Sequence, residues 1–304
     1  MKKNILVIGG SYFYGRVFTE TFYRDRGYHI YIINRGNNPL DIEGVEEIIC
    51  DRTDMSALKK YLPKIKWDAV IDFCAYTPQD ARCLLSALNY KSIKHYILIS
   101  TVSIYRQTRD LPIKENSPKL TGPQPELGMA AGYGYNKMLT EKFVSTHCRQ
   151  YHIPYTFLRP AVIFGKYNYA PRESYFFDLI TNGKPVVLPE LDLPLFQFVS
   201  VWDAVQILIQ CIGNTDTFNH AYNLAGPELI SYGRLIEVFE LVTGLNIQTR
   251  HMSMASIDSR RIPLPFPLDS HLIYSGLLIQ QTLDYRYTPF SEGMRRTWEW
   301  YRQS

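Results

Sequence analysis

The sequence has no stretch that approaches the roughly 18 consecutive apolar residues that a membrane-spanning helix requires. It also has no internal repeat and no low-complexity tract, which argues against a repeat protein or a disordered one. The first three residues lead directly into a strand-like segment and not into a signal peptide. We therefore expect a globular protein of the cytoplasm that makes no contact with a membrane.

Cysteine is scarce and unpaired. The five cysteines are odd in number, show no Cys-x-x-Cys spacing and lie mostly in apolar segments, which predicts reduced thiols in the core. His147, Cys148 and His152 form the closest group of metal-ligating residue types, but they fall at a predicted helix end without a second ligand pair. We therefore expect no metal site.

An excess of charge of one sign is also missing. The 33 basic and 29 acidic residues give a net charge of only +4. The densest basic cluster, at residues 59–66, is typical of a solvated helix face. Nucleic-acid binding would need a longer basic stripe with exposed aromatic rings, so the charge pattern argues against a nucleic-acid partner.

What the first half does contain is an alternation of short apolar runs with helical patterns, which predicts βαβ units and a parallel sheet. Beyond Arg159 the pattern changes to short strands, loops and many prolines. We expect an α/β fold, a doubly wound Rossmann sheet in residues 1–165 with returns near 196–226, and a smaller substrate lobe mainly in 166–304. The predicted strands are 4–9, 29–34, 46–50, 69–73, 96–100 and 155–158, and the predicted helices are 15–26, 55–61, 80–89 and 133–150.

A glycine-rich turn joins the first predicted strand to the first predicted helix, and this context is that of a dinucleotide-binding fingerprint. Its expected cofactor contacts are Gly9, Gly10, Ser11, Tyr12, Phe13 and Gly15. Tyr12 replaces the middle glycine of a GxxGxxG spacing. Either its ring points outward over the phosphates, or the affinity for the cofactor is reduced.

The end of the second strand bears on the choice of cofactor. Asn34 and Arg35 stand where an acidic residue would bind the ribose hydroxyls of NAD. A guanidinium can instead pair with a 2′-phosphate. The sequence therefore favours NADP over NAD, although Arg35 can equally be an arginine of a surface loop.

Tyr133 and Lys137 are the expected catalytic pair, because residues four apart lie on one helix face. A tyrosine works as an acid or base near neutral pH only if its phenolate is stabilised, and a lysine ammonium does this. Such pairs also arise by chance on helices. Thr101, just beyond the fifth strand, is expected to bind the substrate oxygen, with Ser100 and Ser103 as alternatives.

In this order the motifs resemble the extended short-chain dehydrogenase/reductase family of nucleotide-sugar epimerases and dehydratases. The glycine variant is similar to an atypical GGTxFxG subgroup, which also includes chloroplast stem-loop RNA-binding proteins. The resemblance implies further cofactor contacts, to the adenine and to the nicotinamide side, and helices 133–150 and 172–182 as the core of a homodimer. These further cofactor contacts are Asp51, Arg52, Cys74, Ala75, Pro160 and Val162.

One departure from the family concerns the substrate. Phe196 stands where nucleotide-sugar enzymes commonly place an arginine that grips a substrate phosphate. Arg159, Arg172 and Arg234 are the alternatives, and we take Arg172 and Ser103 as candidate substrate contacts.

Three functions follow from these patterns. The first is hydride transfer between NAD(P) and a sugar or nucleotide sugar, as in epimerisation or dehydration, which the motif order favours. The second is an NADPH-dependent reductase of a small non-nucleotide carbonyl compound. The third is a non-catalytic RNA-binding or cofactor-sensing protein, against which the complete set of Thr101, Tyr133 and Lys137 argues.

Overall fold

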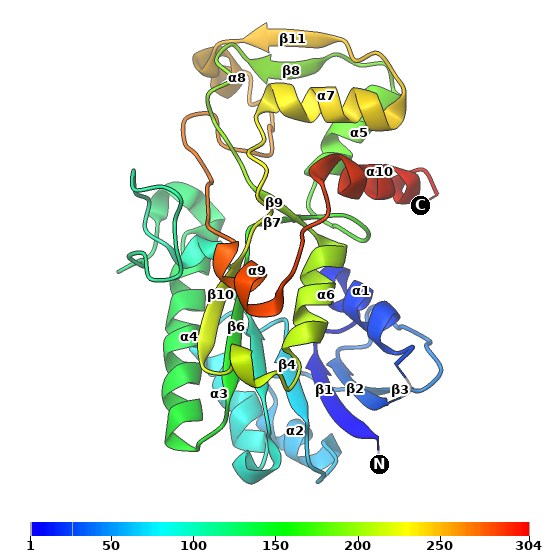
Figure 1. Cartoon of the computed structure of the whole chain (residues 1–304), viewed down its shortest axis with the longest axis vertical. Helices are drawn as coiled ribbons and strands as arrows, with labels where there is room; N and C mark the ends of the chain where they lie inside the picture. Colours follow the sequence, from blue (N-terminus) through cyan, green and yellow to red (C-terminus); the bar gives the residue numbers. More distant parts are fainter. Residues whose placement is uncertain (1, 26, 304) are drawn as a thin grey trace.

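A parallel sheet of seven strands forms the centre of the fold (Figure 1). The computed structural model describes residues 2–25 and 27–303. The strand order confirms the predicted doubly wound Rossmann arrangement. Across the sheet the strands are β10 (His220–Leu224), β6 (Tyr155–Pro160), β5 (Tyr96–Ile99), β4 (Ala69–Asp72), β1 (Lys3–Ile8), β2 (Tyr28–Asn34) and β3 (Val45–Ile49).

The strands are continuous apolar runs because helices cover both faces of the sheet. Along β1, Ile5 and Val7 pack on one side with α1 (Phe13–Phe22) and α6 (Val201–Cys211). Leu6 and Ile8 pack on the other side. That second layer consists of α2 (Met55–Tyr61), α3 (Pro78–Ala87) and α4 (Tyr133–Gln150).

A smaller lobe lies beyond the carboxyl ends of the strands (Figure 1). Two short parallel pairs occur here, and the pair β7–β9 runs between the sheet and this lobe. The elements here are β7 (Val162–Phe164), α5 (Glu173–Thr181), β8 (Val186–Pro189), β9 (Phe198–Ser200), α7 (Tyr232–Thr243), β11 (Thr249–Met252), α8 (Met254–Ser259) and α10 (Phe290–Tyr301). The helix α9 (Leu277–Leu283) lies instead beside the sheet, against β10. Short 3-10 helices connect the rest: η1 (Tyr90–Ser92), η2 (Val102–Ile104), η3 (Pro125–Ala130) and η4 (Thr215–Thr217).

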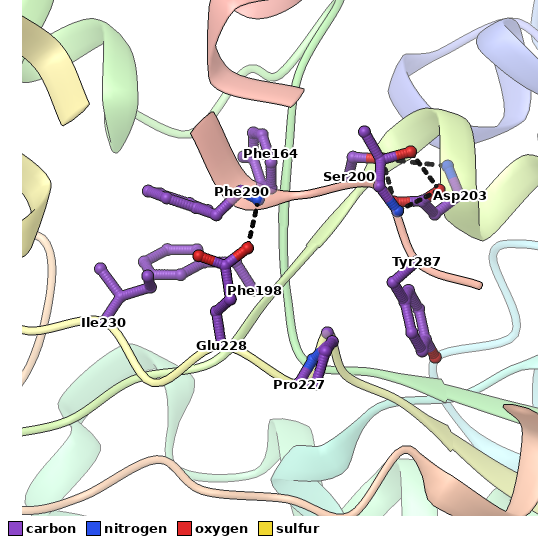
Figure 2. A pocket seen from close by; sticks show the side chains of 11 residues that line it. Phe164, Phe198, Ser200, Asp203, Pro227, Glu228, Ile230, Tyr287 and Phe290 are labelled. Atoms are coloured by element: carbon purple, nitrogen blue, oxygen red, sulfur yellow. Dashed lines mark hydrogen bonds between the residues drawn. The ribbon is translucent and has the colours of Figure 1, made fainter. Parts of the chain in front are cut away.

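Two carboxylates, the buried Asp203 and the half-buried Glu228, connect the lobe to the sheet, as Figure 2 shows. The Ser200 hydroxyl donates to Asp203 over 2.7 Å and accepts its amide over 3.0 Å, so it caps α6. Thr288 Oγ1 donates to the same carboxylate over 2.8 Å, and Glu228 accepts the amide of Phe290 over 2.7 Å. The cavity between these groups, about 20 Å³, has room for little more than a water molecule.

The predicted strands and helices are confirmed, with shifted ends. The third helix begins at Pro78 and not at residue 80, because Thr77 and Asp80 form a capping box. None of the helices in the described residues is long and apolar enough to cross a membrane.

The helix pair predicted for a dimer does not form one surface. α4 lies on the sheet beside α3, whereas α5 lies in the upper lobe near α7 and α10 (Figure 1). Phe176 and Phe177 of α5 are fully buried, and both pack on Phe239 of α7. The pairing of helix 133–150 with helix 172–182 was therefore wrong, because the apolar face of α5 fills the core of its own lobe.

Phe196 belongs to that same core. Its side chain is 0% exposed, and its ring packs on those of Tyr232 and Phe266 at 5.4 and 5.1 Å. Its amide donates to the carbonyl of Ile230. Position 196 therefore suits an apolar ring, and an arginine there would have no access to water for its guanidinium.

We predict that Phe196→Ala lowers the free energy of unfolding by about 3–5 kcal/mol, because it leaves a cavity among aromatic rings. Leu193→Ala is the control, since Leu193 is 67% exposed and should change stability by less than about 0.5 kcal/mol. Urea denaturation of both variants measures this difference. A loss below about 1 kcal/mol for Phe196→Ala would contradict the assignment to the core.

Candidate functional site

The glycine turn joins β1 to α1 through a close approach of the chain to itself. A side-chain carbon at Gly15 would lie 2.2 Å from the carbonyl oxygen of Gly9, so only glycine lets the helix start here. Gly10 and Ser11 are buried in the turn, and the N-cap residue Tyr12 makes no side-chain capping bond. The first amides of α1 are thus available to an anion such as a pyrophosphate. The turn fits a dinucleotide.

The side chain of Tyr12 points away from this turn. Its side chain is 50% exposed and stacks on Tyr169 with ring centroids 5.0 Å apart. Phe13 also meets the ring of Tyr169, edge to face at 5.9 Å. The structure therefore agrees with the first alternative for Tyr12, a ring that points outward, and it adds a partner from the segment between β7 and α5.

The two candidate residues at the end of β2 have different surroundings. Asn34 is buried, donates to Glu47 over 2.6 Å and accepts the amide of Gly36 over 2.7 Å, so its side chain builds the turn. Arg35 is exposed. Of the two, Arg35 has the side chain that can reach a ribose phosphate.

Asp51 lies close to Arg35 at the neighbouring strand end. Its carboxylate accepts the amide and the hydroxyl of Thr53 over 2.8 and 2.7 Å. These bonds, and then the charge of Arg35, lower the pKa of Asp51. An exposed carboxylate and an exposed guanidinium thus border the region where an adenosine would lie.

Arg52 turns inward. Its guanidinium holds both oxygens of Asp72 over 2.6 and 2.9 Å and donates to the carbonyl of Asp80 over 2.8 Å. It also lies 3.4 Å from Cys74 Sγ, and the Tyr96 hydroxyl donates to Asp72 over 2.8 Å. The side chain of Arg52 is therefore committed to Asp72, which leaves its backbone for any contact with a cofactor.

Lys137 is held at the carboxyl ends of β4 and β5. Its side chain is buried, and Nζ donates to the carbonyls of Ala75 and Ile99 over 3.0 and 2.7 Å. Burial lowers the pKa of Lys137 to about 8, and the charge of Asp72 opposes this shift. Nζ also lies 5.3 Å from the centre of the Tyr76 ring. The ammonium is thus charged at neutral pH and fixed in place.

Tyr133 begins α4 next to Thr101 and Ser103. The approach is close, because a side-chain carbon at Gly134 would lie 2.1 Å from the carbonyl oxygen of Ser103. Thr101 Oγ1 accepts the Ser103 amide and donates to the Ser103 hydroxyl, both over 3.1 Å. Burial raises the pKa of Tyr133, and a hydrogen bond with Thr101 opposes the rise. Two hydroxyls and a phenol thus meet beyond β5.

The residues expected to contact the nicotinamide and the substrate follow one another from the end of β6 onward. Pro160 is the last residue of β6, and Val162 is the first of β7. Arg172 Nη1 donates to the carbonyl of Ile163 over 3.2 Å, and its charge acts to lower the pKa of Tyr133. Arg172 is therefore a cation near the phenol.

The other two arginines are occupied. Arg159 is buried, donates to both oxygens of Glu141 over 2.9 and 2.7 Å, and donates to the Tyr105 hydroxyl over 2.7 Å. Arg234 forms an exposed ion pair with Glu237 on α7. Of the three alternatives to an arginine at position 196, only Arg172 lies near the catalytic candidates.

Sequence reasoning missed three residues of this region. Asp72 is the buried partner of Arg52, and Tyr76 and Tyr169 are close enough to Tyr133 to raise its pKa or have their own raised by it. Tyr76 follows the predicted fourth strand, which was a usable signal. Tyr169 lies far along the chain, and nothing local marks it. The described residues hold no group of three His, Cys, Asp or Glu side chains that could bind a metal ion.

Solved structures and curated relatives share this architecture. UDP-glucose 4-epimerase of Thermotoga maritima superposes with a TM-score of 0.80 at 18% identity, covering 99% of both chains. UDP-glucuronic acid 4-epimerase of Bacillus cereus, in complex with NAD, superposes with a TM-score of 0.77 at 17% identity, again covering 99% of both. Identities this low show a shared fold.

Two curated proteins are similar in sequence. The chloroplast stem-loop binding protein of 41 kDa b of Arabidopsis thaliana is 23% identical over 248 residues, which are 77% of this chain and 61% of that protein. The chain thus spans less than two thirds of that relative. The dTDP-D-glucose 4,6-dehydratase of Homo sapiens is 22% identical over 275 residues, 84% of this chain and 74% of the enzyme.

The family is shown by a match over most of the chain. The model of the NAD dependent epimerase/dehydratase family matches residues 5–225. This range includes the glycine turn together with Thr101, Tyr133 and Lys137. The resemblance inferred from the sequence is thereby confirmed: the chain belongs to the NAD dependent epimerase/dehydratase family.

Proposed function

We propose that the chain is an NAD(P)-dependent epimerase that inverts a hydroxyl-bearing carbon of a nucleotide sugar by reversible hydride transfer. The observation that carries the proposal is the meeting of Thr101, Tyr133 and the buried Lys137 at the carboxyl ends of β4 and β5. The glycine turn opens at the same edge of the sheet, where ligands of such folds bind. The similarity to UDP-glucose 4-epimerase and UDP-glucuronic acid 4-epimerase supports the substrate class.

Each residue has one task in this reaction. When bound, NAD(P) supplies a reversible hydride acceptor. The phenolate of Tyr133 takes the proton of the reacting hydroxyl and later returns it. The ammonium of Lys137 stabilises this phenolate before the proton arrives and after it leaves. Thr101 hydrogen-bonds the substrate oxygen and orients it. The hydride returns to the opposite face of the ketone and the proton returns to its oxygen. The configuration of that one carbon is therefore inverted, and the cofactor and Tyr133 regain their starting states.

Epimerisation is favoured over dehydration by the residues after Thr101. Removal of water needs a second acid and base beside the catalytic phenol. Val102 and Ser103 follow Thr101 and supply no carboxylate. Thr101, Tyr133 and Lys137 suffice for oxidation and reduction at one carbon.

Two other functions remain as alternatives. A reductase of a small carbonyl compound is favoured by the apolar Phe196, and it would consume NADPH in proportion to product. An RNA-binding role is favoured by the similarity to the stem-loop binding protein. The complete catalytic set supports the epimerase over both.

Tyr133→Phe should reduce turnover at least about 100-fold, because the variant has no group that exchanges the proton. Binding of NADH, followed by fluorescence titration, should be unchanged. Tyr135→Phe, two residues further along α4 and therefore on a different face of the helix, is the matched control and should keep full activity. Full turnover by Tyr133→Phe on UDP-glucose would show that the catalytic assignment is wrong.

Turnover should fall about tenfold per pH unit above about pH 8, because Lys137 loses its proton there and no longer stabilises the phenolate. The charged form dominates below that pKa, so activity is retained toward neutral pH. Lys137→Arg keeps its charge throughout the range, so its residual turnover should lack this decline. Rates that stay flat in the wild type to about pH 10 would contradict a titrating Lys137.

We further propose that the enzyme accepts NADP, through Arg35. Arg35→Ala should weaken NADPH binding about tenfold and NADH binding less than twofold, since only NADPH carries the 2′-phosphate. Arg109→Ala, another exposed arginine, controls for the loss of charge. Calorimetric titration with both cofactors measures the difference. Equal losses for NADH and NADPH would remove this role of Arg35.

A further inference from the structure

A second cavity lies away from the candidate active site, between α4 and the strands β6 and β10. Its volume is about 370 Å³, within the range of small-molecule sites. β10 is the edge strand of the sheet, and α4 runs beside it (Figure 1). Its lining combines basic side chains of α4 and of the segment before η3 with apolar side chains of β6.

Cations converge on this cavity from separate parts of the chain. Lys142 and Arg149 come from α4, and Lys119 comes from the segment before η3. Such a cluster of like charges is unfavourable unless an anion joins it. The charges therefore point to an anionic occupant.

The carboxylate in the lining does not neutralise these cations. Glu141 has both of its oxygens bound by Arg159, over 2.9 and 2.7 Å, at the buried floor of the cavity. Burial lowers the pKa of Lys119; the charge of Arg159 adds to this lowering, and the charge of Glu141 opposes it. The lining thus keeps a net positive charge.

One wall of the cavity is apolar. Tyr155 and Phe157 alternate along β6 with ring centroids 4.9 Å apart, and Met138 of α4 adds to the same lining. Tyr155 and Phe157 are only 7% and 4% exposed, so they form an apolar floor and not an open stacking face. An occupant would therefore combine an anionic group with an apolar body.

We propose that this cavity is a ligand site, distinct from the cofactor cleft, that binds a phosphorylated small molecule of mononucleotide size. Lysine ammonium groups act as point-charge partners of phosphate, and Arg149 adds a forked donor. The phosphate would lie among Lys119, Lys142 and Arg149, and the base against Tyr155 and Phe157. This proposed site does not depend on the proposed epimerase reaction.

The test is calorimetric titration of the wild type with adenosine 5′-monophosphate, with the cofactor cleft filled by excess NAD. We expect binding that NAD does not displace. The double variant Lys142→Ala/Arg149→Ala should weaken it at least tenfold. Both side chains are exposed, so the fold should persist, and a thermal melt of the variant checks this. Lys59→Ala/Lys60→Ala, which removes two exposed lysines from α2, should leave binding unchanged.

Four outcomes would overturn the proposal. One is no binding by the wild type, and another is complete displacement by NAD, which would place the nucleotide in the cofactor cleft. A third is equal weakening in the two double variants, which would show attraction to net charge only. The last is adenosine binding as tightly as its monophosphate, which would remove the phosphate from the recognition.

Discussion

The candidate site depends on one buried charge, the ammonium of Lys137. Taking an ammonium group out of water costs several kcal/mol even after the protein relaxes, unless polar partners replace the water. Here the carbonyls of Ala75 and Ile99 supply those partners over 3.0 and 2.7 Å. These carbonyls stand at the ends of two neighbouring parallel strands, so the bonds fix α4 relative to the sheet. The position of Tyr133, one turn earlier on α4, follows from the same bonds.

A second buried pair supports this charge. Asp72 is 0% exposed at the end of β4 and would be costly alone. Arg52 binds both of its oxygens, and Tyr96 donates to one of them. Because Asp72 also acts to raise the pKa of Lys137, the loop after β3, the end of β4 and the catalytic lysine form one electrostatic unit. A change in the charge of Asp72 would therefore shift the pKa values of both Arg52 and Lys137.

Most of the sheet could be predicted from the sequence, because strands that are buried on both faces appear as apolar runs. The placement of Tyr133 and Lys137 one turn apart on a helix could be predicted too, whereas their catalytic role stays a prediction. The inward turn of Arg52 could not, because its partner Asp72 lies 20 residues away and was counted only as part of a strand. The place of α5 also escaped prediction: its amphipathic pattern shows that one face is buried but not against which lobe.

The outward ring of Tyr12 is another such case, and it explains how a bulky residue can replace the middle glycine. Tyr169 receives the ring of Tyr12, and the segment that carries Tyr169 is itself tied to α1. The hydroxyl of Tyr167 and the ammonium of Lys166 both donate to Glu20 of α1 over 2.8 Å. The same segment continues to Arg172, near the phenol of Tyr133. The replacement of glycine by tyrosine is thus matched by contacts that join α1 to the segment carrying Tyr169 and Arg172, so the proposed cofactor helix and the residues near Tyr133 are positioned together.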